Sequence, residues 1–389
     1  MPSAKPAISC LALLLAASVV TGCDARSTKA AATASPSATA STAIQISISH
    51  CGDNWKPAGA GEQNLVVHNA DTRPGEVLLT DAKTGAVFSY LEPFAPGSTA
   101  DMDVSLPAGN YKFRCAMEDE DVIDGPTVTI TGPVSGTTTP GVVPVTQGEL
   151  IGPTKQYEQY VTTQLPALDQ LTATLVKDVR SDNLSQARSD WLPAHLQYER
   201  LGAAYGAFGD ADRAINGTIE GLPGGVNDPD FVGFHRLEYG LWHGQSAVTL
   251  TPIANALMKA VQSLTSDFAK TQIEPADVSI RAHEITENAI EFELTGDVDF
   301  GSHSNLDTVA ANLVGTRTVL DLLKPLLLTR YPDLGRVYTT LAKSQKAIPA
   351  LTTLPELSRS QREDLNADLG ELVELLAPIA EICEPRRTS

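Results

Sequence analysis

The spacing of hydrophobic residues changes along the chain, from a period of two to a period near 3.6. From residue 44 to residue 132, apolar and polar residues alternate in short runs, as at Ile44, Ile46 and Ile48. Turn sequences such as Lys83-Thr-Gly85 separate these runs. Short, regularly spaced strands with this alternation predict an antiparallel β-sandwich over residues 44–132.

From Leu150 onward, apolar residues recur at helical spacing. Two long helices are expected around the apolar stripes that begin at Tyr157 and at Leu184. Long helices joined by short turns predict an all-α up-and-down helical bundle, so the fold class is a multidomain β-then-α protein. Five further helices are expected at about residues 229–243, 251–271, 275–294, 304–330 and 358–382.

The N-terminal residues carry targeting signals. Lys5 precedes a short apolar run from Ile8 to Val20, which is typical of a signal peptide and too short to span a membrane. Small residues followed by Cys23 match a lipobox, which predicts cleavage before Cys23 and acylation of its sulfur. An ordinary secretory signal with an incidental cysteine is the alternative. The protein is therefore expected to be extracytoplasmic and lipid-anchored to the cell membrane.

The segment after Cys23 is rich in Ala, Ser and Thr and has almost no large apolar side chains, so we expect a flexible tether. A second linker is rich in Thr, Pro and Val. The predicted division is a signal peptide at 1–22, a lipid-anchored tether at 23–43, a β-sandwich at 44–132, a linker at 133–148 and a helical bundle at 149–389.

The chain is acidic, with a formal net charge of −19. A surface of this sign repels nucleic acid and favours cations, so no nucleic-acid partner is expected. Solubility is the more ordinary reason for a negative surface.

The first candidate site lies in the run from Gly233 to Trp242. Asp228-Pro229 reads as an N-cap followed by proline at the first helical position, which predicts a helix start there. His235 and Glu238 are three residues apart, and residues at this spacing project from the same face of a helix. The pair is suited to holding a metal ion, and the alternative is that the two side chains hydrogen-bond each other.

Other predicted helices offer further carboxylates. Glu199 lies beside the apolar stripe of the second helix, and Glu284 lies on a face with Glu287 and Glu291. For the last three, a solvated acidic face is the alternative, and Glu284 is kept as a candidate ligand. Oxygen and nitrogen ligands without thiolate suit iron, and they also accept copper or zinc. The chain lacks His-Glu-x-x-His and Gly-x-Ser-x-Gly, so no catalytic residues are predicted.

Two cysteines lie at the ends of predicted strands. Outside the cytoplasm, Cys51 and Cys115 are candidates for a disulfide. The alternative is a second metal site that uses their thiolates, together with Met117 or the acidic residues that follow it.

Three segments together resemble the imelysin-like domain of EfeO-type iron-uptake proteins. They are Gly233-Phe-His-Arg-Leu-Glu-Tyr-Gly-Leu-Trp242, Tyr198-Glu-Arg200, and Leu320-Asp-Leu-Leu-Lys-Pro-Leu-Leu327 after Ala311-Asn312. The stretch Leu106-Pro-Ala-Gly-Asn-Tyr-Lys-Phe-Arg-Cys115 is similar to the end of the cupredoxin-like domain that precedes it in such proteins. The resemblance implies that His235, Glu238 and Glu199 are metal ligands.

The same resemblance implies a function. It indicates an iron-binding component that captures ferrous or ferric iron outside the cytoplasm and delivers it to a membrane iron permease, together with a haem peroxidase of the same uptake system. An imelysin-type metallopeptidase is the alternative function, and a structural or adhesive surface lipoprotein is a third possibility.

Overall fold

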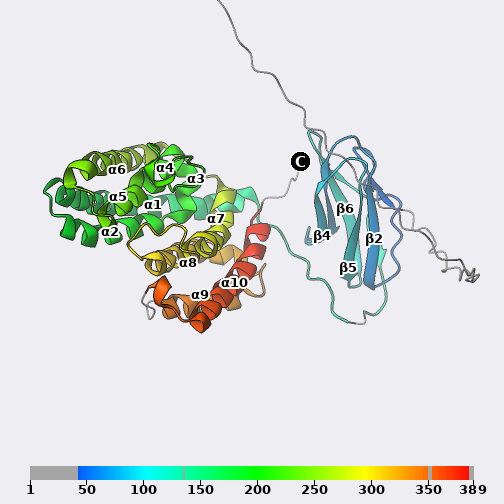
Figure 1. Cartoon of the computed structure of the whole chain (residues 1–389). Coiled ribbons are helices and arrows are strands. Elements are labelled where there is room, and N and C mark those ends of the chain that lie inside the picture. The colour runs from blue at the N-terminus through cyan, green and yellow to red at the C-terminus, as the bar shows by residue number, and fades with distance from the viewer. Residues whose placement is uncertain (1–42, 135, 349–352, 385–389) are drawn as a thin grey trace, which may run out of the picture. The chain divides into compact units, whose positions relative to one another are not determined.

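The computed structural model of the chain describes residues 43–134, 136–348 and 353–384. The predicted signal peptide, Cys23 and nearly all of the predicted tether lie outside the described residues. The N-terminal region is built from strands and the C-terminal region from helices (Figure 1), as the spacing of apolar residues predicts.

The strands of the N-terminal region form two sheets. One has the order β1-β2-β5, and the other has the order β4-β3-β6-β7, with β8 paired to β6. The strand pairs are antiparallel except for β1 and β2, which run parallel. The strands are β1 (Ile44–Ile46), β2 (Gly61–Asn69), β3 (Gly75–Asp81), β4 (Val87–Phe94), β5 (Thr99–Leu106), β6 (Gly109–Met117), β7 (Ile123–Asp124) and β8 (Val128–Ile130).

Alternating burial explains how these strands pack. In β2, Leu65 and Val67 are buried, while Glu62 and Asn64 between the buried positions are exposed. Buried residues of both sheets form one core, which excludes water from the inner faces.

Cys51 and Cys115 form a disulfide within this core. Two roles were expected for this pair, a disulfide and a thiolate metal site, and the structure contains the disulfide. In the oxidised form, neither sulfur is available as a thiolate ligand.

The helices of the C-terminal region enclose a second, larger core. They are α1 (Gln147–Arg180), α2 (Leu184–Glu199), α3 (Tyr205–Phe208), α4 (Asp210–Asn216), α5 (Gly233–Trp242), α6 (Ala247–Asp267), α7 (Pro275–Asn288), α8 (Asn305–Leu327), α9 (Leu334–Ala347) and α10 (Arg359–Ile382). A π-helical turn at Ala289–Glu293 continues α7.

Two helix predictions need correction. The helix with His235 begins at Gly233 and not at Asp228, because the Asp228 carboxylate accepts hydrogen bonds from the backbone N–H groups of Gly224 and Asp230. It therefore caps a turn. Helix α9 was not among the expected helices, although its buried residues Leu334, Val337 and Leu341 recur at helical spacing.

A small apolar cluster lies apart from the larger core. Its buried members are Phe231, Val298 and Phe300, and Tyr239 and Phe292 pack against it. This small cluster joins the loop before α5 to the segment that follows the π turn.

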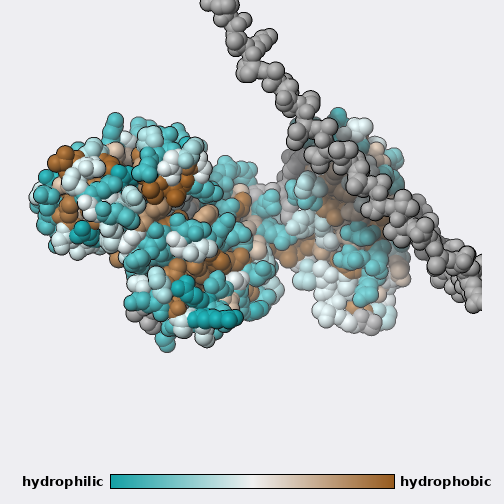
Figure 2. Space-filling model, in the orientation of Figure 1, coloured by the Kyte–Doolittle hydropathy of each residue, from teal (hydrophilic) through white to brown (hydrophobic). Residues whose placement is uncertain are grey.

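The surface in view in Figure 2 is mainly hydrophilic, and hydrophobic residues form only limited patches on it. Among the helices of the described residues, none combines the length and the hydropathy that a membrane span requires.

Candidate metal centre

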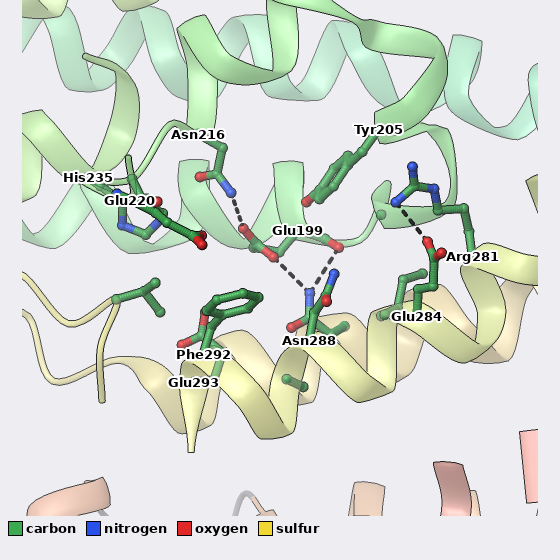
Figure 3. A pocket seen from close by; sticks show the side chains of 16 residues that line it. Glu199, Tyr205, Asn216, Glu220, His235, Arg281, Glu284, Asn288, Phe292 and Glu293 are labelled. Atoms are coloured by element: carbon green, nitrogen blue, oxygen red, sulfur yellow. Dashed lines mark hydrogen bonds and ion pairs between the residues drawn. The ribbon is translucent and has the colours of Figure 1, made fainter. Parts of the chain in front are cut away.

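A cavity of about 170 Å³ lies among the helices. Figure 3 shows the side chains that line it. Residues from the end of α2, from α5, from α7 with its π turn, from α8 and from the loop after α4 line it. Figure 3 labels Glu199, Glu220 and His235 among the side chains that line this cavity. The polar residues that line the cavity include Glu199, Asn216, Glu220, His235, Arg281, Glu284, Glu293 and Asn312.

Glu199 is the last residue of α2, and its carboxylate is buried. Asn216 donates a hydrogen bond to Oε1 at 2.7 Å, and Asn312 donates one to Oε2 at 2.7 Å. Burial opposes ionisation, but the contact with His195 and the hydrogen bond from Asn312 outweigh it and lower the pKa of Glu199 to about 2. Glu199 is therefore a carboxylate at neutral pH.

His195 lies one helical turn before Glu199. Its Nε2 atom is 3.1 Å from Oε1 of Glu199 and 3.1 Å from Oδ1 of Asn216. The ring is buried and stacks on Trp191. His195 therefore supports Glu199 from behind the cavity wall.

Helix α5 is held close to α4 by Gly233. Its φ angle is +82°, and a Cβ atom at this position would lie 2.3 Å from the carbonyl oxygen of Ile215. Only glycine tolerates both conditions without strain. The close approach places His235, two residues later, on the cavity that Asn216 also lines.

His235 and Glu238 contact each other. Nδ1 of His235 lies 3.3 Å from Oε2 of Glu238, and both side chains are buried. His235 lines the cavity, whereas Glu238 is not among the lining residues. The two residues therefore contact each other as expected, but only His235 is exposed to the cavity.

The segment after the π turn saturates the other oxygen of Glu238. Oε1 accepts hydrogen bonds from the backbone N–H groups of Phe300 at 3.1 Å and Ser302 at 3.0 Å, and from the Ser302 hydroxyl at 2.6 Å. These donors satisfy a buried charge that would otherwise be costly.

Asn312 reaches Glu199 because α8 passes close to the end of α2. A Cβ atom at Gly315, one turn further along α8, would lie 3.0 Å from the carbonyl oxygen of Arg200. A larger residue at this position would push the two helices apart.

Glu284, the weaker candidate from the sequence, lines the same cavity. Its Oε2 atom lies 2.8 Å from Nη1 of Arg281, and both side chains are partly exposed. The ion pair compensates part of its charge. Glu287 contacts His283 and Glu291 is exposed, so these two are solvated, as the alternative interpretation held.

Glu293 is a cavity residue that the sequence did not single out. Burial and the neighbouring carboxylate of Glu199 raise its pKa well above the usual range. Asn305 donates a hydrogen bond to Oε2 at 2.8 Å. No ion pair joins Glu293 to a basic residue in the described part of the chain.

The donor set suits a hard or intermediate metal ion. It consists of carboxylate oxygens and an imidazole nitrogen, with no thiolate, as iron sites commonly have. Within residues 43–134, 136–348 and 353–384, no three His, Cys, Asp or Glu side chains already lie close enough together to hold an ion. Binding would therefore require side chains of the cavity to move toward one another.

Several supporting residues escaped prediction from the sequence. His195 and Glu199 have a spacing of i, i+4, which is a signal that could have been used. Asn216 and Asn312 carry no charge and no characteristic spacing. Glu293 lies on the π turn, where the ordinary helical period does not apply.

Comparison with known proteins identifies the family. Residues 153–379 match the family model of imelysin, which is more than half of the chain and includes every helix that lines the cavity. The chain belongs to the imelysin family.

Individual proteins similar to this chain are components of iron uptake systems. The chain is 28% identical to the iron uptake system component EfeO of Yersinia pestis over 268 residues, which cover 69% of each protein. It is 24% identical to EfeO of Escherichia coli K12 over 350 residues, covering 86% of this chain and 89% of the relative. It is 29% identical to the iron uptake system component EfeM of Pseudomonas syringae over 177 residues, which cover 46% of this chain and 62% of the relative. The expected resemblance to EfeO-type proteins is confirmed.

Proposed function

We propose that this imelysin-family protein is the iron-binding component of an iron-uptake system. It captures iron outside the cytoplasm, is anchored to the membrane through lipid on Cys23, and delivers iron to a membrane permease. The cavity that brings His235 and Glu199 together carries the proposal, because it offers nitrogen and oxygen ligands in a partly enclosed space. His235, Glu199, Glu238 and the more weakly placed Glu284 form the proposed metal centre.

The similarity to EfeO over most of both chains supports iron as the ion that is carried. The proposed domain division is that of the sequence analysis, with a cupredoxin-like N-terminal region. A membrane iron permease and a haem peroxidase are the proposed partners in uptake.

Isothermal titration of the metal-stripped full chain with ferrous, ferric, cupric and zinc ions tests the proposal. We expect stoichiometric binding of one form of iron, with tighter affinity than for zinc. Absence of binding by both ferrous and ferric ions would refute iron capture. Binding of zinc alone, together with cleavage of peptides, would instead favour the metallopeptidase function.

A further inference from the structure

Both oxygens of Glu238 are occupied. Three donors from Phe300 and Ser302 surround Oε1, and Oε2 contacts Nδ1 of His235. The side chain is only 1% exposed and does not line the cavity. To bind an ion directly, this carboxylate would have to leave partners that are buried with it.

The contact with Glu238 determines which nitrogen of His235 is available. A carboxylate next to Nδ1 favours the tautomer with the proton on Nδ1, so the lone pair lies on Nε2. No residue in the described part of the chain hydrogen-bonds to Nε2. His235 is therefore prepared to bind an ion through Nε2, with Glu238 behind it.

The π turn brings another carboxylate to the cavity. Cavity residues recur along α7 and its extension at Arg281, Ile285, Ala289 and Glu293. Over twelve residues, a regular α-helix would turn about 120° beyond three full turns, which would carry Glu293 off this line. The π turn, marked by the bond from Leu294 N–H to the Ala289 carbonyl at 3.0 Å, winds less tightly and restores the alignment.

Glu293 lacks a cation where it lies. The one hydrogen-bond donor that the described residues supply to it is the neutral amide of Asn305. The nearby charges that act on it are carboxylates, those of Glu199, Glu238 and Asp299. A partly buried carboxyl group beside other carboxylates resists ionisation, and a bound cation would favour its ionised form, which can ligate the cation.

This inference rests on the proposed metal capture and refines its ligand set. We propose that Glu293 is a direct ligand of the ion, together with Nε2 of His235 and Glu199, and that Glu238 is a positioning residue that holds the His235 ring. The ion draws the three ligating side chains together, because they do not lie at binding distance in its absence.

Titration of the metal-stripped full chain with Fe²⁺ under anaerobic conditions tests the assignment. Glu293→Gln retains an oxygen for Asn305 but lacks the charge, and we expect it to weaken Fe²⁺ binding at least as strongly as the roughly 10–100-fold loss typical of outer-shell replacements. Glu291→Gln, two residues away and exposed, is the matched control and should bind like the wild type. Unchanged affinity of Glu293→Gln would overturn its role as a ligand.

A double-mutant cycle tests the role of Glu238. If Glu238 acts through His235, Glu238→Ala weakens binding by roughly 10–100-fold in the wild type and has no further effect in His235→Ala. An equal loss in both backgrounds would make Glu238 a ligand in its own right and overturn the assignment. If the wild type itself does not bind Fe²⁺, iron capture fails, which is a different outcome from either variant result.

If His235→Ala abolishes binding, the cycle cannot be completed, and a spectroscopic measurement tests whether Glu238 positions the His235 ring. In the Cu²⁺-loaded full chain, pulsed electron paramagnetic resonance detects the ring nitrogen that is remote from the metal. We expect the Glu238→Ala variant to keep the imidazole signal but to change the quadrupole coupling of this remote nitrogen, because its hydrogen bond is lost. An unchanged coupling would overturn the positioning role. Thermal unfolding of each metal-free variant checks that the fold is retained.

Discussion

Glu199 and His195 lie one turn apart on α2, and Oε1 of the carboxylate is 3.1 Å from Nε2 of the imidazole. Both side chains are buried. The histidine thus holds the carboxylate at the end of its helix, where Asn312 of α8 and Asn216 of α4 also reach it. His195 does not line the cavity, yet it fixes the position of the proposed ligand Glu199.

We expect His195→Ala to weaken iron binding by roughly 10–100-fold, because Glu199 loses a partner that fixes its orientation. Titration of the metal-stripped variant measures the effect. His283→Ala is a matched control, since this partly exposed histidine contacts Glu287 and does not line the cavity. Equal affinities of the two variants would contradict the supporting role of His195.

Asp299 is expected to make part of the stability depend on pH. It accepts hydrogen bonds from the backbone N–H groups of Gly301 and His303 and contacts the His303 ring. Burial opposes ionisation, but these partners outweigh it and lower the pKa of Asp299 below 3.8. A lowered carboxyl pKa contributes stability that is present above the unfolded value and is lost as the pH falls through the folded value.

Asp299→Asn should therefore lower the free energy of unfolding by roughly 1–2 kcal/mol at pH 7. The difference from the wild type should shrink as the pH falls below about 4. Urea unfolding of both proteins at several pH values measures it. A difference that stays constant down to pH 2 would show that the charge of Asp299 is not responsible.

The disulfide stabilises the N-terminal region. Its two cysteines are 64 residues apart, and the chain-entropy relation gives a contribution of up to about 4 kcal/mol for a loop of this length. The double variant Cys51→Ser/Cys115→Ser should unfold this region at lower denaturant concentration while Fe²⁺ affinity stays the same. Loss of Fe²⁺ binding in a variant that is still folded would instead indicate that the cysteines contribute to metal binding.

The proposed lipid anchor is tested at Cys23. If its sulfur is acylated, Cys23→Ala should move the protein from the membrane fraction to the medium or leave it unprocessed. Detergent partitioning and mass measurement of the N-terminal peptide distinguish these results. Membrane association that is unchanged in the variant would argue for an ordinary secretory signal.

Gly233→Ala should lower the free energy of unfolding by more than about 1–2 kcal/mol, because alanine adds a clash with the Ile215 carbonyl to an unfavourable positive φ. Gly370→Ala, within α10, is a control for which we expect a change in stability of the opposite sign. A Cβ atom there meets nothing within 4 Å, and the change should stabilise the helix by roughly 0.5–1 kcal/mol. Chemical denaturation of the two variants compares them.

The order of β and α regions was predictable because periods of two and 3.6 are properties of the local sequence. The start of α5 was not, since Asp228 caps a turn through Gly224 and Asp230. Proline after an aspartate signals a turn as readily as a helix start.

The surroundings of the candidate site were only partly predictable, for a different reason. His235 and Glu238 share a helix, and spacing alone brings them together. The contacts of Glu199 with Asn216 and Asn312 join segments far apart in the sequence, and the packing of α4 and α8 creates them. The presence of an asparagine does not predict such a contact with a carboxylate, because asparagine is common at turns and on helix surfaces.

The small apolar cluster of Phe231, Val298 and Phe300 packs against the candidate site and is separate from the main core. Phe300 packs against the His235 ring, with centroids 5.3 Å apart, and against Phe231, with centroids 5.1 Å apart. Since this cluster is separate from the main core, it can open as a sub-global unit while the long helices stay folded. For an ion bound at His235 as proposed, the residence time would then depend on these few aromatic contacts and not on the thermodynamic stability of the whole domain.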